Sequence, residues 1–117
     1  GPFHSRLMQP ANEEFAKHLD AVTITEAYMP IYANVTAAPV TQRVEVKQLL
    51  LKQLYSPVRF EQSIENMLKE DVDAFVEVGT GKVLCGLVRK INRKTKTFAI
   101  QDVASFEKFL EWYREEV

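Results

Sequence analysis

The spacing of hydrophobic side chains predicts several amphipathic helices. Apolar residues recur every three or four positions over 11–19, 42–54 and 60–68, which is the spacing of one face of an α-helix. A further helix is predicted over 82–93, and Asp102 is a suitable N-cap for a last one. The buried face of that last helix is expected to consist of Phe106, Phe109, Leu110 and Tyr113.

Three short apolar runs separate these helices and predict strands over 30–35, 73–78 and 97–100. Around the second run, Val72, Ala74, Val76 and Val78 share one side and Phe75 lies on the other, which indicates that both sides are covered. We also expect so small a sheet, on its own, to leave an edge or a face uncovered. Strands that alternate with helices through short loops indicate a parallel sheet with helices on its faces. We therefore predict an α/β fold with a short parallel sheet of about three strands.

Composition narrows the class of protein. The 117 residues are 46% hydrophobic and 26% charged, which predicts a single folded piece over 1–117. A net charge of −1 argues against nucleic acid as a partner, and no apolar run is long enough for a membrane-spanning helix. One cysteine and two histidines are too few for a structural zinc site, and we expect no metal and a reducing, cytoplasmic setting.

Three familiar catalytic or nucleotide-binding motifs are absent from the sequence. The glycines at 79 and 81 lack the further positions that a P-loop or a dinucleotide fingerprint requires. None of the four serines has a glycine two residues before it, so there is no nucleophile elbow. His4 is the informative titratable residue, because imidazole is the usual general base for a hydroxyl nucleophile.

Four blocks in order along the chain resemble the malonyl-CoA:acyl carrier protein transacylases. They are GPFHSRLMQPA at 1–11, YANVTA at 32–37, QLYSPVRF at 53–60 and EVGTGKVL at 77–84. The first resembles the segment around the active-site histidine of that family. The resemblance covers nearly the whole chain and weakens over the last helix.

The resemblance implies acyl transfer by a ping-pong route in fatty-acid synthesis. A serine takes malonyl from coenzyme A and passes it to the phosphopantetheine thiol of acyl carrier protein, with no cofactor beyond these thioester substrates. In the family that serine lies upstream, so the chain resembles the C-terminal part of a hydrolase-like acyltransferase domain. The isolated chain is then expected to be inactive, with its missing N-terminal part as a partner.

Carried over position by position, the resemblance assigns four residues. His4 matches the catalytic base, and Gln53 matches the position whose backbone carbonyl orients the histidine. Asn34 matches a polar residue of the same pocket. Phe3 beside the base would select malonyl over methylmalonyl. Gln53 and Asn34 could equally close a helix or strand end, and Phe3 could be a core residue.

Positive charges gather near the end of the helix predicted over 82–93. Arg89, Lys90 and Arg93 could dock the acidic acyl carrier protein, although the helix dipole alone favours cations at this place. Two other classes of protein remain open: an acyltransferase fragment of a polyketide synthase, and a non-catalytic α/β interaction module in which His4 is incidental.

Overall fold

The computed structural model describes residues 1–116, which divide into two compact units, one over residues 1–66 and one that begins at Met67. Each unit is described by itself, and the expectation of one packed piece stays a prediction. Within residues 1–116, no helix combines the length and apolarity needed to cross a membrane.

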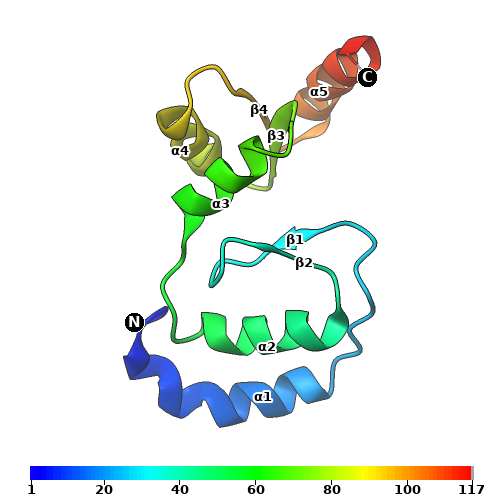
Figure 1. The fold of residues 1–117 in the computed structure, drawn as a ribbon. Helices are drawn as coiled ribbons and strands as arrows, with labels where there is room; N and C mark the ends of the chain where they lie inside the picture. Colours follow the sequence, from blue (N-terminus) through cyan, green and yellow to red (C-terminus); the bar gives the residue numbers. More distant parts are fainter. Residues whose placement is uncertain (117) are drawn as a thin grey trace. The chain divides into compact units, whose positions relative to one another are not determined.

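Two helices that lie side by side form the base of the first unit (Figure 1). A 3₁₀ helix, η1 (Arg6–Ala11), leads into α1 (Asn12–Asp20), and α2 (Arg43–Gln53) packs along α1. Acidic residues occupy the first turn of α1 and basic residues its last turn, which suits the helix dipole. Leu19 is buried, and Lys47 of α2 forms an ion pair with Asp20.

A small hairpin completes the first unit together with α3 (Phe60–Leu68), most of which belongs to it. Strand β1 (Ile31–Tyr32) pairs antiparallel with β2 (Pro39–Val40). The prediction that 30–35 joins a parallel sheet is therefore wrong. Six residues connect the two strands, and a loop of that length returns the chain antiparallel, whereas a parallel pair needs a long crossover.

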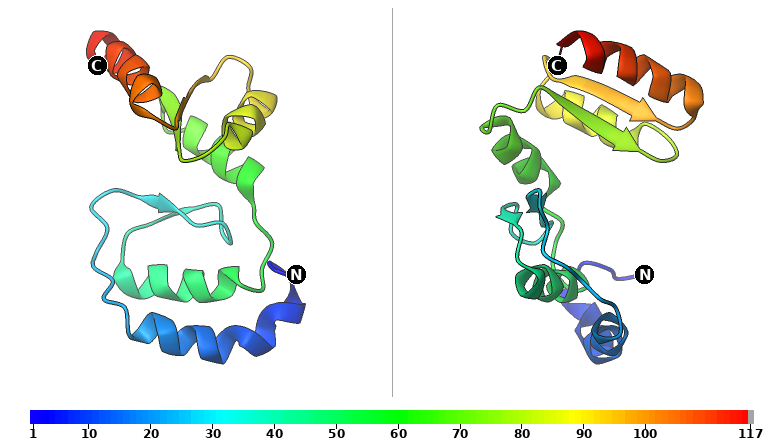
Figure 2. Two further views of the ribbon diagram at one scale, coloured as in Figure 1. Left: turned by 180° about the vertical axis from the view of Figure 1, so that it is seen from behind. Right: turned by 90° about the vertical axis from the view of Figure 1, so that its right-hand side faces the viewer.

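The second unit is a βαβ arrangement followed by a helix (Figure 2). Strands β3 (Ala74–Val78) and β4 (Lys96–Ile100) pair in parallel, and the crossover between them contains α4 (Val83–Ile91). Helix α5 (Val103–Glu116) follows β4. The α/β class is confirmed, with two strands in the parallel sheet where about three were expected.

Aromatic side chains join α5 to β4. The ring of Phe98 lies 5.3 Å from that of Phe109 and 5.0 Å from that of Trp112. Phe106 and Tyr113, which were expected to be buried, are 45% and 47% exposed. The helix is turned so that residues 109 and 112, one turn apart, face the strand, and the pattern missed Trp112.

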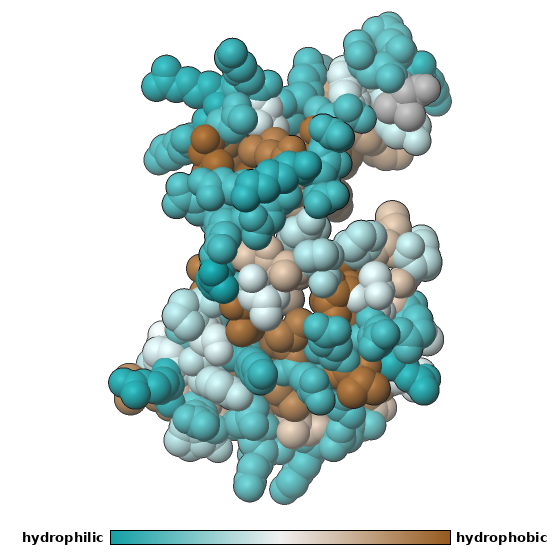
Figure 3. Space-filling view, in the orientation of Figure 1, coloured by the Kyte–Doolittle hydropathy of each residue, from teal (hydrophilic) through white to brown (hydrophobic). Residues whose placement is uncertain are grey.

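Apolar side chains also remain on the surface of both units (Figure 3). Val76 and Val78 of β3 are 39% and 79% exposed. Within the described residues this side of the strand is therefore uncovered, as expected for so small a sheet. The helices of the second unit bury other positions, among them Cys85 and Val88 of α4.

Asp102 begins α5, as the sequence predicts. Its carboxylate accepts hydrogen bonds from the Ser105 backbone N–H (2.8 Å) and hydroxyl (2.7 Å). These bonds hold the pKa of Asp102 below its ordinary value, because they favour the charged form. A carboxylate with a lowered folded pKa stabilises the fold above its unfolded pKa, and this stabilisation is lost as the pH falls through the folded pKa.

We expect Asp102→Ala to lower the thermal unfolding temperature at pH 7, because the first turn of α5 loses its cap. The difference from the unmodified chain should shrink as the pH falls below about 4 and through the lowered pKa of Asp102, because the protonated carboxyl is a weaker cap. Circular dichroism melts over this range measure the difference. Glu107→Ala, on the same helix but outside the cap, is the control. A gap that stays constant down to pH 2 would contradict this role.

Candidate active site

His4 is fastened to the C-terminal end of α2 by two hydrogen bonds. Its backbone N–H donates to the carbonyl of Leu54 at 3.0 Å, and its ring Nδ1 lies 2.8 Å from the carbonyl oxygen of Gln53. The Ser5 hydroxyl closes the turn by donating to the Pro2 carbonyl at 2.6 Å. Segments about fifty residues apart in the sequence are thereby joined.

These contacts use acceptors that a helix leaves unpaired. The last carbonyls of an α-helix have no partner within it, and those of Gln53 and Leu54 lie at this end of α2. A carbonyl oxygen only accepts hydrogen bonds, so the bond at Nδ1 requires a proton on that nitrogen. In the neutral ring Nε2 is then the unprotonated nitrogen, and the side chain of His4 is exposed.

The structure brings Asn34 and Gln53 together at a small cavity of about 100 Å³ in the first unit. Its other lining residues are mostly apolar and come from β1, β2 and α2, among them Tyr32 and Leu49. The Asn34 carbonyl also accepts the Arg59 backbone N–H at 3.0 Å, which ties the segment after α2 to the hairpin. His4 is outside this lining and reaches Gln53 through the backbone carbonyl.

Phe3 lies next to His4 and is 62% exposed, so it is not part of the core of this unit. Its ring packs against the backbone of Gly1, where an added Cβ would approach the ring to 2.9 Å. Phe3 is outside the lining of the small cavity at Asn34 and Gln53. Its role in selecting malonyl stays a prediction.

The basic residues lie in the second unit. Arg89 and Lys90 occupy the last turn of α4, Arg93 follows it, and all three are exposed. The helix dipole accounts for the first two, as expected. Within residues 1–116, no group of three or more His, Cys, Asp or Glu side chains is arranged to hold a metal ion.

Glu77 is a positioning residue that the sequence pattern missed. Its carboxylate accepts the Cys85 backbone N–H at 2.9 Å, which lowers the pKa of Glu77 and fastens the start of α4 to β3. Burial raises the pKa of the Cys85 thiol. A glutamate at the end of a strand that precedes a helix is the signal that could have predicted this cap.

Comparison with known proteins finds relatives in sequence and in structure. No family model matches it, but it is 47% identical over 116 residues to the malonyl CoA-acyl carrier protein transacylase of Bacillus subtilis (strain 168), covering 99% of this chain. The solved structure of the malonyl CoA-acyl carrier protein transacylase from Clostridium perfringens matches 99% of the chain with a TM-score of 0.90 and 34% identity. The chain is homologous to part of the malonyl CoA-acyl carrier protein transacylases.

The match is to a segment of these transacylases. The chain spans 37% of the length of the Bacillus subtilis relative and 37% of the Clostridium perfringens structure. A third solved structure, with a TM-score of 0.88 and 31% identity, covers 94% of this chain and 36% of its own. It is described as a malonyl-transacylase in complex with a type II polyketide synthase acyl-carrier protein.

We expect neutral His4 to carry its proton on Nδ1, because the Gln53 carbonyl accepts from that nitrogen. Long-range proton–nitrogen NMR correlations of the labelled 117-residue chain identify the tautomer, with His18 as an internal comparison. Gln53→Ala should leave the result unchanged, since the acceptor belongs to the backbone. Predominance of the Nε2–H tautomer at His4 would contradict the assignment.

Proposed function

We propose that this chain supplies the general base of a malonyl-CoA:acyl carrier protein transacylase. The supporting observation is the bond between Nδ1 of His4 and the Gln53 carbonyl, which fixes the ring and leaves Nε2 as the proton acceptor. A buried carboxylate has this orienting role in a serine protease, and here a main-chain carbonyl takes it. The nucleophilic serine is contributed by a segment outside this chain.

The proposed reaction has two half-reactions linked by one proton acceptor. Nε2 of His4 takes the proton of the serine hydroxyl as its oxygen attacks the thioester carbonyl of malonyl-CoA, and it returns that proton to the departing coenzyme A thiolate. Nε2 next takes the proton of the phosphopantetheine thiol as sulfur attacks the malonyl ester. The proton then goes to the serine oxygen as malonyl leaves on acyl carrier protein.

The other site residues have positioning roles in this proposal. Gln53 acts through its carbonyl, and its side chain matters little. Asn34 holds the segment after α2 by accepting the Arg59 N–H, and so supports the carbonyl that orients the ring. Phe3 beside the base disfavours the methyl group of methylmalonyl.

The pathway of this reaction is fatty-acid or polyketide synthesis, since both use malonyl carried on an acyl carrier protein. The similar solved structure that is bound to a polyketide synthase carrier protein supports polyketide synthesis beside fatty-acid synthesis in this proposal. The buried, unpaired thiol of Cys85 suits the reducing cytoplasm, in which we place the enzyme.

We expect His4→Ala in the intact enzyme that contains this chain to reduce malonyl transfer by about 10³-fold or more, because no other group accepts the serine proton. Transfer of radiolabelled malonyl from coenzyme A to acyl carrier protein measures the loss. His18→Ala removes the other histidine, on α1, and should leave the rate within about twofold. Equal rates for the two alanine variants would refute the proposed base.

We also propose that Lys90 and Arg93 steer the acidic acyl carrier protein, together with Arg89. Charge reversal at both (Lys90→Glu with Arg93→Glu) should raise the KM for acyl carrier protein about tenfold and leave the kcat for malonyl transfer unchanged. The effect should weaken with added salt, because exposed charges are screened.

The matched control for this docking test is Lys17→Glu with Lys69→Glu, which changes the net charge equally at two other exposed lysines. If both double variants change the KM to the same extent, net charge is responsible and the docking proposal fails.

A further inference from the structure

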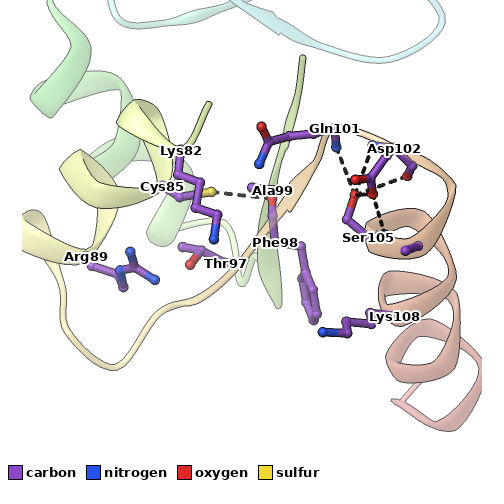
Figure 4. Close-up of a pocket in the computed structure, with 11 residues that line it drawn as sticks. Lys82, Cys85, Arg89, Thr97, Phe98, Ala99, Gln101, Asp102, Ser105 and Lys108 are labelled. Atoms are coloured by element: carbon purple, nitrogen blue, oxygen red, sulfur yellow. Dashed lines mark hydrogen bonds between the residues drawn. The ribbon is translucent and has the colours of Figure 1, made fainter. Parts of the chain in front are cut away.

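A groove of about 450 Å³ lies between α4 and α5 of the second unit, beside β4 (Figure 4). This volume is in the range of small-molecule sites, which is about 300–1,000 Å³. No residue of the proposed catalytic site lines the groove. It therefore has a separate place in the fold and is a candidate site of its own.

Positive charge dominates the lining of this groove. Lys82 and Arg89 lie on the α4 side, and Lys108 faces them from α5. The carboxylate of Asp102 is the one acidic group in the lining, and its Oδ1 already accepts the N–H and hydroxyl of Ser105. Three cations and one carboxylate leave a formal charge of +2 on the groove.

The three cations have no internal acidic partner in the described part of the chain. The ion pairs found within residues 1–116 are those of Arg43 and Lys47 in the first unit. Positive side chains that converge on a hollow and outnumber its one carboxylate favour an anionic ligand, because each new charge-assisted hydrogen bond is stronger than a neutral one.

The floor of the groove adds main-chain donors. In a parallel pair, every second residue of a strand directs its N–H and carbonyl toward the neighbouring strand. Ile100 of β4 is such a residue, because its carbonyl accepts the N–H of Gly79, just after β3. The N–H groups of Thr97 and Ala99 therefore point away from β3. Both residues line the groove, beside the apolar surface of Phe98.

The spacing of the cations indicates the length of the ligand. Lys82, Cys85 and Arg89 follow one face of α4, and seven residues of helix correspond to about 10 Å. A single phosphate is too small to meet cations at both ends of this stripe and on α5. A diphosphate with an organic group has both the charge and the length.

From this arrangement we infer that the groove between α4 and α5 binds the diphosphate group of a small organic phosphate ester. Lys82, Arg89 and Lys108 hold the phosphates, the amides of Thr97 and Ala99 add donors, and the apolar wall takes the organic part. Nucleoside diphosphates and coenzyme A share this chemistry. The inference does not depend on the proposed function.

The first test titrates inorganic pyrophosphate into the ¹⁵N-labelled 117-residue chain at low ionic strength. The amide signals of Thr97 and Ala99 should shift with saturation, and added salt should weaken the binding. Lys82→Gln with Lys108→Gln, which removes one cation from each wall, should raise the Kd at least about tenfold.

The matched control is Lys90→Gln with Lys94→Gln, which removes two charges of the same unit that do not line the groove. It should change the Kd by less than about twofold, and circular dichroism checks that both variants fold. No shift at Thr97 and Ala99, or the same weakening in both double variants, would overturn the inference.

A second titration distinguishes the sources of the diphosphate. Coenzyme A that binds more tightly than ADP identifies the groove as a site for the thioester substrate, whereas equal or tighter binding of ADP identifies a general nucleotide site. Failure of both to displace pyrophosphate would overturn the assignment to an organic phosphate ester.

Discussion

The attachment of His4 to the end of α2 is the constraint on which the candidate active site depends. A histidine in an exposed turn has many ring orientations, and the two carbonyls of Gln53 and Leu54 select one of them. The same bonds satisfy acceptors that the helix cannot pair. One arrangement thus completes the helix end and fixes the ring, so the position of α2 determines the position of the His4 ring.

The rest of the first unit holds that helix end in place. The Arg59 N–H donates to the Asn34 carbonyl, so the chain leaving α2 is joined to the hairpin. Asn66 of α3 donates its side-chain amide to the carbonyl of Ala37 at 2.8 Å, at a residue that is fully buried. These contacts join the chain that leaves α2, and α3 after it, to the hairpin that contains Asn34.

The sequence predicts the helices of this chain well because their signals are local. The five helices, the cap at Asp102 and the strands over 73–78 and 97–100 follow from spacing and capping within a few residues. The pairing of 30–35 did not follow, because an apolar run of this length does not specify its partner. The exposure of Val76, Val78, Phe106 and Tyr113 also depends on which elements of the second unit face one another.

The candidate site also has features that the sequence could predict and features that it could not. Resemblance identified His4, Asn34 and Gln53, and the bond from the ring to the Gln53 carbonyl is present in the structure, while the catalytic meaning of these residues stays a prediction. The second anchor at Leu54 could not be predicted, since a main-chain acceptor leaves no side-chain signal. The cap from Glu77 was missed, although a glutamate near the end of a strand that precedes a helix is a signal for it.

The backbone at His4 bears on the alternative that this histidine is incidental. Its φ is +63°, in the left-handed region that residues with a Cβ rarely adopt, at a cost of the order of 1–3 kcal/mol. Glycine would adopt this conformation freely, but it has no ring to bond to the Gln53 carbonyl. Here the strained turn is what lets both the N–H and Nδ1 of one residue reach adjacent carbonyls of α2. The left-handed backbone of His4 is therefore part of the arrangement that fixes the ring and leaves its second nitrogen free of this bond.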